Sequence, residues 1–379
     1  MKSTKLLFVV TEDWYFCSHR LSLAVSARQA GYDVAVATRI TDHKQVIEKS
    51  GLRVIPLRRM RRSGITPFRE LATFMELLLI FYRERPHLVH LVALKPVVYG
   101  SLAAKLVGIP ARVSALAGLG FIFSSNKFLA RFLRPIFLKV FRIVFNDARS
   151  RLILQNKDDL IAVVDKAGVD RKGIRLIRSA GVDLDQYTLS EIPSGSPVVM
   201  LASRLLWDKG VGEFVDAAKT LREQRVQARF VLVGEPDMEN PSSVSRAQLQ
   251  EWNKSGVVEW WGYRTDMPKV LSQASVVCLP SYYGEGVPKV LIEAMACGRP
   301  IVTTNMPGCR DLVQPSKNGL LVNPKDFMGL ANSLVCLVVD RSLCQKMGIE
   351  GRSIVEKEFS VKRVTQETMS VYRELSNPW

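Results

Sequence analysis

The feature that most constrains this chain is an alternation of two kinds of segment that starts at its first residues. Short apolar runs alternate with longer segments whose apolar residues recur every three to four positions. Short apolar runs are typical of buried strands, and the longer period is typical of helices. Strands and helices in alternation build βαβ units, in which a parallel sheet is covered by helices. The sequence therefore predicts a doubly wound α/β fold.

This alternation stops once, at a polar stretch, and then restarts. The stretch after Asp185, QYTLSEIPSGSP, has the composition of a hinge between domains. We predict an N-terminal domain at 1–186, a second domain at 187–360, and a last helix at 361–379 that packs back on the first domain. The strands are predicted at 5–10, 33–38, 53–56, 87–92 and 112–116, then at 198–202, 230–233, 257–260, 276–279 and 301–303. The helices are predicted near 18–30, 71–83, 97–106, 211–225, 244–254, 267–273, 288–297, 326–338 and 361–375.

Composition narrows the class of protein. The 379 residues are 47% hydrophobic, with 24 Gly and 18 Pro, which is near the average for globular proteins and excludes disordered and collagen-like chains. The six cysteines form no CxxC pair, so we expect reduced thiols and a cytoplasmic protein. The apolar run before Thr11 is too short for a signal peptide, and no apolar stretch of 18 residues follows. We therefore expect a chain that does not cross a bilayer.

Positive charge is concentrated in the first half. Of a net charge of +17, residues 1–190 contribute +16, with 31 basic against 15 acidic residues, and no Asp or Glu occurs from 85 to 146. Cations interleaved with Phe and Leu can lie in a membrane interface, with the apolar side down and the charges toward anionic headgroups. The predicted membrane-binding residues are Arg58, Arg59, Arg61, Arg62, Lys127, Arg131, Arg134, Lys139 and Arg142. The alternatives are a core helix with a solvated basic side, or nucleic-acid binding, for which no zinc or RNP-like motif is found.

Two segments of the second half have residue types suited to a nucleotide. In LASRLLWDKGV, Arg204 and Lys209 follow a predicted strand, where two cations and the amides of a helix N-terminus could converge on a diphosphate. In SYYGEGVPKVLIEAMACGRPIV, seven residues separate Glu285, in a glycine-flanked loop, from Glu293, which lies inside a predicted helix.

These motifs come in an order that resembles one family. SRLLWDKG, VLVG, WWGYRTDMP, the segment around Glu285, PGCRDLV and NGLLV resemble the retaining glycosyltransferases of the GT-B fold that have the E-x7-E motif, in particular family 4 enzymes of bacterial surface-polysaccharide and lipid-linked glycan synthesis. The resemblance implies two Rossmann-like domains that face each other across a cleft. It covers the second domain and, more loosely, the first.

The resemblance also implies roles for residues of the second domain. Arg204 and Lys209 would hold the diphosphate of a sugar nucleotide, Glu293 would bind the ribose, and Glu285 with the following amides would orient the donor sugar. The implied donor-binding residues are Arg204, Lys209, Gly234, Glu285, Gly286, Val287, Pro288 and Glu293, of which Arg204, Lys209 and Glu285 are the catalytic candidates. No metal or other cofactor is then required. Asp183-Leu184-Asp185 is interpreted as a turn rather than a metal-binding motif.

The first domain would then bind the acceptor. The candidate acceptor contacts are Asp13, His19 and Arg20, after the first strand, with Gly118 and Gly120, whose backbone could approach a sugar closely. The chain departs from the family at Ala117, the position nearest to a His that many relatives have there. This departure puts a His-dependent contact with the donor sugar in doubt.

Together these observations predict an enzyme. We expect a metal-independent, retaining transfer of a sugar, of the N-acetylhexosamine type and from a UDP donor, onto a polyprenyl-diphosphate-linked saccharide of O-antigen, capsule or a related glycan. The expected partners are the nucleotide sugar, the lipid-linked acceptor and an anionic membrane, at the inner face of the plasma membrane, with no nucleic acid. The alternatives are a transferase for a small-molecule or glucan acceptor, a UDP-sugar epimerase of the same architecture, and a basic nucleic-acid-binding protein.

Overall fold

The structure, a computed structural model, describes residues 3–62, 66–119 and 128–376. The chain divides into two compact units. The first domain consists of Met1–Ala180 together with Val361–Trp379, and the second domain is Gly181–Ser360. The division thus falls at Gly181, ahead of the polar stretch in which the sequence predicts a hinge. Each domain is described below by itself.

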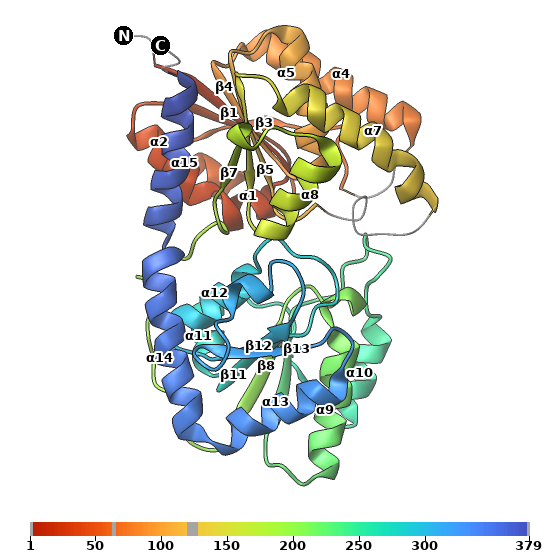
Figure 1. Ribbon diagram of the computed structural model, residues 1–379, viewed down its shortest axis with the longest axis vertical. Coiled ribbons are helices and arrows are strands. Elements are labelled where there is room, and N and C mark those ends of the chain that lie inside the picture. The colour runs from red at the N-terminus through yellow and green to blue at the C-terminus, as the bar shows by residue number, and fades with distance from the viewer. Residues whose placement is uncertain (1–2, 63–65, 120–127, 377–379) are drawn as a thin grey trace. The chain divides into compact units, whose positions relative to one another are not determined.

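The first domain is built on a parallel sheet with the strand order β3-β2-β1-β4-β5-β6-β7 (Figure 1). Short buried runs form the central strands; all five residues of β4, for example, are buried. The strands are β1 (Lys5–Glu12), β2 (Asp33–Arg39), β3 (Arg53–Pro56), β4 (Leu88–Val92), β5 (Ala111–Leu116), β6 (Ser150–Leu154) and β7 (Ile174–Leu176). The sequence predicts the first five of these strands, whereas β6 and β7 were not predicted.

Helices cover both faces of this sheet. One face packs against α4 (Pro67–Glu84), α5 (Ser101–Val107), α7 (Phe128–Phe145) and α8 (Lys157–Ala167), and the other against α1 (Asp13–His19), α2 (Leu21–Gln29), α3 (Lys44–Lys49) and α15 (Val361–Ser376). The helix predicted near 18–30 is α2, whereas α1, which begins directly after β1 and ends before Arg20, where φ is −131°, was not predicted. A single π-helical turn, Pro96–Gly100, precedes α5.

The second domain repeats this architecture with the strand order β10-β9-β8-β11-β12-β13. Its strands are β8 (Val198–Ala202), β9 (Arg229–Val233), β10 (Glu259–Trp260), β11 (Val276–Leu279), β12 (Ile301–Thr304) and β13 (Gly319–Val322). Its helices are α9 (Val211–Glu223), α10 (Arg246–Lys254), α11 (Met267–Ser272), α12 (Lys289–Ala296), α13 (Phe327–Val339) and α14 (Arg341–Glu358). The sequence predicts all of these except β13 and α14. Two Rossmann-like domains of this kind are the predicted fold class.

One prediction about the first domain needs correction. The apolar side of α7 was predicted to lie in a membrane, yet much of it belongs to the core: Phe141, Val144 and Phe145 are at most 2% exposed and pack with β6 and α8, whereas Ile136 and Ile143 are exposed. The cations of this part, Lys139 and Arg142, lie on the exposed side of the helix. The helix also runs through Pro135 without being split. Lys127 and the side chain of Arg131 lie outside the described residues.

None of the described helices is by itself long and apolar enough to span a membrane. Only α13 and α14 taken together meet the requirements of length and composition, and the two are bent by 100° relative to each other.

Candidate functional site

The candidate site of the second domain lies at the point in its parallel sheet where the strand order reverses. From the neighbouring strands β8 and β11 the chain continues to opposite sides of the sheet, β9 beyond β8 and β12 beyond β11. In parallel sheets, ligands bind outside the carboxyl ends of the strands at this reversal. The loop after β8 contains Arg204 and Lys209, and the loop after β11 contains Glu285. The fold therefore brings two of the predicted motifs together.

An ion pair joins these two loops. Lys209 Nζ contacts Glu285 Oε1, and both side chains are largely shielded, at 16% and 14% exposed. The Ser281 hydroxyl lies 3.1 Å from the same carboxylate oxygen and 3.0 Å from the Asp208 carbonyl. A carboxylate and an ammonium are thus held at fixed positions at the edge of the sheet, where they present charge to a ligand without reorganisation.

Two glycines let the loops at this edge pack closely. At Gly234, which follows β9 with φ of +130°, a Cβ would come within 1.9 Å of the Ser203 carbonyl oxygen. At Gly308, after β12 with φ of +80°, a Cβ would come within 2.0 Å of the Gly286 carbonyl oxygen. Both conformations suit only glycine. Gly234 therefore has a structural reason to be glycine, whether or not it contacts a donor.

Arg204 has a different partner from Lys209. Its Nη1 lies 2.6 Å from Oδ2 of Asp237, on the loop after β9, and its side chain is 44% exposed. The structure thus places both predicted cations at the same edge of the sheet but pairs each with its own acid. The pair at Arg204 is the more accessible of the two, so this cation can leave Asp237 for an incoming anion at lower cost.

Glu293 lies in α12 and is only 7% exposed. Its Oε1 accepts a hydrogen bond of 2.9 Å from the Tyr187 hydroxyl and lies 2.9 Å from Lys289 Nζ. Burial, with the Glu293 carboxylate beside it, raises the pKa of Tyr187 well above its usual value, so its hydroxyl keeps its proton and donates. Sequence reasoning did not select Tyr187, because 106 residues separate it from its partner.

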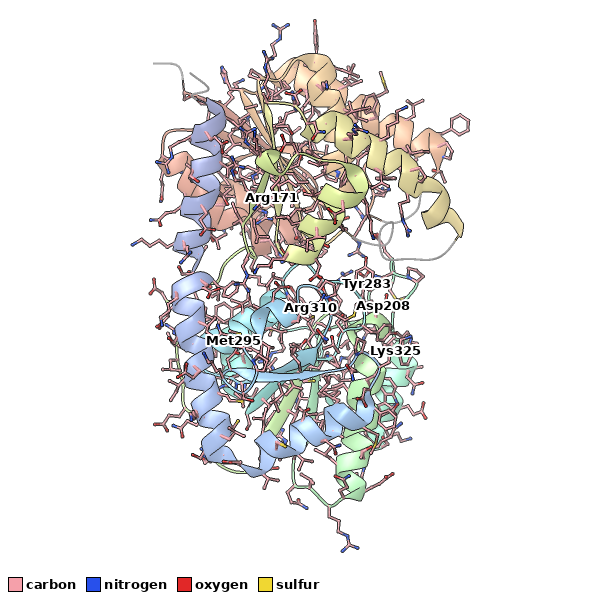
Figure 2. All side chains as sticks on the ribbon, in the orientation of Figure 1. Arg171, Asp208, Tyr283, Met295, Arg310 and Lys325 are labelled. Atoms are coloured by element: carbon pink, nitrogen blue, oxygen red, sulfur yellow. The ribbon has the colours of Figure 1, made fainter. Side chains whose placement is uncertain are left out.

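Further side chains gather at the same edge. Lys325, in the loop after β13, places its Nζ 4.8 Å from the centre of the Tyr282 ring, and the Tyr282 amide donates to the Asp208 carbonyl at 3.1 Å. Figure 2 shows Asp208, Tyr283 and Lys325 on one side of the second domain. The Cys309 thiol lies near Glu285 and Lys209, and burial raises its pKa to about 12, so the thiol stays protonated. Lys325 was not predicted, because β13, the strand that precedes its loop, was not predicted.

The remaining donor-loop residues continue from Glu285 into α12. The Glu285 amide donates to the Pro307 carbonyl at 3.2 Å, Val287 is 7% exposed, and Pro288 immediately precedes the helix as its cap residue. Gly286 approaches Gly308 as described above. This loop is therefore held by β12 as well as by β11.

The Asp183-Leu184-Asp185 segment forms a turn, as the sequence predicts: the Asp185 amide donates to Asp183 Oδ1 at 3.0 Å. Within the described parts of the chain, no group of three or more His, Cys, Asp or Glu side chains could hold a metal ion.

In the first domain the sheet reverses between β1 and β4, and Asp13 follows β1 directly. Its side chain is fully buried and accepts hydrogen bonds from the Thr41 hydroxyl (2.6 Å) and from the amides of Thr41 (2.7 Å), Trp14 (2.8 Å) and His43 (3.1 Å). Asp13 therefore anchors the loop after β2. Its predicted contact with the acceptor stays a prediction.

The two other polar candidates of this loop differ from each other. His19 is half-buried and stacks on the Tyr15 ring at 4.1 Å. Arg20 is only 6% exposed. The pKa of His90 is lowered mainly because His90 is fully buried, and the charge of Arg20 lowers it further. Arg20 thus faces the interior of the domain, and its predicted contact with the acceptor stays a prediction.

Unusual backbone marks the neighbouring loops of the first domain. Ala93, directly after β4, has φ of +75°, which is strained for a residue with a side chain, and a π-helical turn follows at Pro96–Gly100. Such features cluster at functional sites. Gly118, after β5, has φ of +90°, and Ala117 is exposed. Gly120 lies outside the described residues.

Comparison with known proteins assigns the family. The model of "Glycosyl transferase 4-like" domains matches residues 5–157, and that of "Glycosyl transferases group 1" matches residues 196–340, so that together they account for most of both domains in order. The chain belongs to the GT-B glycosyltransferases.

Two curated relatives of this glycosyltransferase are named as transferases for undecaprenol-diphosphate-linked substrates. It is 28% identical to the Campylobacter jejuni N,N'-diacetylbacillosaminyl-diphospho-undecaprenol alpha-1,3-N-acetylgalactosaminyltransferase, with 86% of each chain covered. It is 26% identical to an Escherichia coli UDP-Gal:alpha-D-GlcNAc-diphosphoundecaprenol alpha-1,3-galactosyltransferase, covering 79% of this chain and 80% of that one.

Solved structures agree on the fold. HepE from Anabaena, crystallised in complex with UDP, matches with a TM-score of 0.79 at 21% identity, covering 98% of this glycosyltransferase and all of HepE. Sucrose-phosphate synthase from Thermosynechococcus elongatus matches with a TM-score of 0.81, also at 21% identity, covering 99% of this chain and all of that one.

Proposed function

We propose that this glycosyltransferase moves a sugar, of the N-acetylhexosamine type and from a UDP donor, onto a polyprenyl-diphosphate-linked saccharide during bacterial surface-polysaccharide synthesis. The observation that supports this most directly is the shielded pair of Lys209 and Glu285 at the reversal of the second sheet. The names of the relatives support the acceptor class, because two of them specify an undecaprenol-diphosphate-linked substrate. HepE, of the same fold, binds UDP.

The donor diphosphate would lie at the carboxyl edge of the second sheet. Negative charge accumulates on a diphosphate as it departs, so cations already in place stabilise the transition state more than the ground state. Lys209 is held by Glu285, whose carboxylate also accepts the Ser281 hydroxyl, and Arg204 can turn from Asp237 to the phosphates. These two cations would supply charge stabilisation with no metal ion.

Glu285 and Glu293 would orient the donor. Glu285 contacts Lys209, and a carboxylate accepts hydrogen bonds from sugar hydroxyls. Tyr187 and Lys289 hold Glu293, so its free oxygen has a fixed direction for the ribose.

Retention of configuration would follow from attack on the same face from which the diphosphate departs. The leaving phosphate would accept the proton of the acceptor hydroxyl, and the bond from the anomeric carbon to the phosphate oxygen would break as the bond to the acceptor oxygen forms. In this scheme the protein's own contribution is positioning and charge stabilisation.

The acceptor would bind at the carboxyl edge of the first sheet. The strained Ala93 turn follows β4 and the Gly118 turn follows β5, and both would line the proposed acceptor site. Asp13 and Arg20, in and after α1, stay predicted contacts of this site. His19 remains a proposed contact from the loop after β1.

The decisive experiment is a thermal-shift screen with UDP, GDP, ADP and TDP and their sugars, each with EDTA and with magnesium. A ligand that binds only the native state raises the melting temperature. We expect a rise with UDP and UDP-N-acetylhexosamines that does not depend on magnesium. Transfer is then measured on polyprenyl-diphosphate-linked and on water-soluble acceptors, with product stereochemistry read by NMR. A rise in melting temperature with GDP alone would overturn the proposed UDP donor. Preferential transfer to a soluble glucan would overturn the proposed lipid-linked acceptor.

A further inference from the structure

Helix α4 is apolar on two opposite sides. One side faces the core of the first domain, where Thr73, Leu77 and Phe81 are buried. The other side faces away from the domain and has large apolar side chains, which we call the α4 stripe. The α4 stripe consists of Phe68 (89% exposed), Leu71 (59%), Met75 (48%), Leu79 (51%) and Tyr82 (62%).

The spacing of the α4 stripe shows that it is a continuous feature. Its members follow one another at intervals of three, four, four and three residues, which places all five along one line of an α-helix. Single exposed apolar residues are normal, whereas a contiguous patch marks an interaction surface. The residues predicted from the sequence to bind a membrane are all cationic and do not include this stripe.

A cationic segment is fastened beside the α4 stripe. The two carboxylate oxygens of Glu76, on α4, accept hydrogen bonds from the amides of Arg58 (2.8 Å) and Arg59 (3.0 Å). Met60, between the arginines, is fully buried. Backbone bonds to α4 and a buried anchor therefore hold this segment, which leaves the Arg58 and Arg59 side chains exposed.

The acids of α4 are all engaged in contacts of this kind. Glu70 lies 2.7 Å from Lys95 Nζ, Glu84 is bound by Arg53, and Glu76 accepts the two amides. Arg69, Arg83 and Arg85, at the two ends of the helix, have exposed side chains. The surface around the α4 stripe is therefore net positive.

We propose that the α4 stripe and the segment Arg58–Arg62 form a surface that binds a bilayer containing anionic lipid. The stripe enters the boundary between headgroups and acyl chains, and the arginines contact lipid phosphates. Charge selects this occupant over a second copy of the chain, because a symmetric dimer through the stripe would oppose cations to cations. In α7, Phe141, Val144 and Phe145 are in the core, whereas the cations Lys139 and Arg142 are exposed together with Ile136 and Ile143.

The position of this surface fits the proposed acceptor, and to that extent the inference rests on the proposed function. The Arg62 guanidinium lies 5.9 Å from the centre of the Trp14 ring, on α1 directly after β1. The cationic segment thus reaches the carboxyl edge of the first sheet, where a lipid-linked diphosphate would be bound.

The test is flotation of the full-length protein with vesicles of phosphatidylcholine, alone or with about 30% phosphatidylglycerol. The stripe variant combines Leu71→Gln, Met75→Gln and Leu79→Gln. The control variant combines Ile161→Gln, Val339→Gln and Ile349→Gln, three exposed helical or helix-end positions elsewhere in the chain. Gln is close to Leu in helix propensity, so both variants should fold. We expect the stripe variant alone to bind anionic vesicles at least about tenfold more weakly.

A second variant reports insertion. Phe68→Trp should gain fluorescence that lipids brominated on their acyl chains quench, beyond any quenching in the wild-type protein. Equal binding by the stripe and control variants, or no binding by the wild type, overturns the proposal, and so does a dimer in solution that only the stripe variant loses. UDP thermal shift and transfer to a water-soluble acceptor should be unchanged in both variants, so a failure of the proposed function is detected separately.

Discussion

At the scale of single residues, a substitution at Glu285 can test whether this residue orients the donor or only stabilises the fold. Glu285→Gln keeps the shape of the side chain and an acceptor for the Ser281 hydroxyl but removes the charge beside Lys209. We expect transfer to fall by about 100-fold or more, the range found when a preorganised polar group is removed from an active site. Rates and melting temperature are measured together.

The matched control for this change is Glu259→Gln. Glu259 also forms an ion pair, with Arg229 at 2.7 Å, but the pair is exposed and lies at the start of its strands. Transfer by this variant should be near the wild-type level. If Glu285→Gln were equally active, the proposed donor site would be wrong.

Asp13 gives a prediction about pH. Burial pushes the pKa of Asp13 upward, but the hydrogen bonds from Thr41, His43 and Trp14 outweigh burial and hold the pKa below the usual 3.8. The ionised carboxylate therefore stabilises the fold above about pH 4, and this contribution is lost as pH falls through the lowered pKa. Asp13→Asn should cost about 2 kcal/mol at pH 7, since an amide cannot accept all four bonds.

Urea denaturation across pH measures this effect. The difference in unfolding free energy between wild type and Asp13→Asn should shrink as the pH falls below about 4. Asp42→Asn, at an exposed neighbouring position, should differ little from wild type at any pH. A pH-independent difference for Asp13→Asn would show that packing, not charge, explains the loss.

At the scale of elements, the loops after β11 and β12 depend on their contact at Gly308. A Cβ there would meet the backbone oxygen of Gly286 at 2.0 Å, so Gly308→Ala must displace the loop that holds Glu285. We expect the thermal shift with UDP to be lost and stability to fall by about 2 kcal/mol or more. Gly284→Ala, in the same loop but with nothing within 4 Å of its Cβ, should keep both.

The same scale shows what the sequence can predict. Strands such as Val198–Ala202 and Val276–Leu279 match their predicted bounds because short, wholly buried apolar runs leave little choice of structure. Strand β13 was missed because only its two end residues are buried. The apolar stripe of α7 was recognised, but periodicity does not say whether protein or lipid covers it. The contact between Tyr187 and Glu293 depends on the assembled fold.

At the scale of the whole molecule, the first domain is assembled from both ends of the chain. Helix α15 returns to it and packs against α2 and β5, where Val371, Tyr372 and Leu375 are buried in the core. The Tyr372 hydroxyl contacts Nδ1 of the buried His90, in the middle of β4. The second domain, by contrast, is one continuous segment, Gly181–Ser360, with its own two cores on either side of its sheet.

This arrangement predicts an asymmetry between fragments. Residues 181–360 alone should fold and give the same thermal shift with UDP as the full chain, because the proposed donor contacts all lie within them.

Residues 1–180 alone should aggregate, since loss of α15 uncovers apolar side chains of the sheet and leaves His90 without the Tyr372 hydroxyl. Adding 361–376 through a flexible linker should restore a soluble, cooperatively folded domain, whereas the same linker with Tyr372→Ala and Val371→Ser should not. Circular dichroism and size-exclusion chromatography decide between these outcomes. A soluble, folded 1–180 fragment would show that the first domain does not need α15 to fold. A 181–360 fragment that folds but does not bind UDP would mean that donor binding needs residues of both domains.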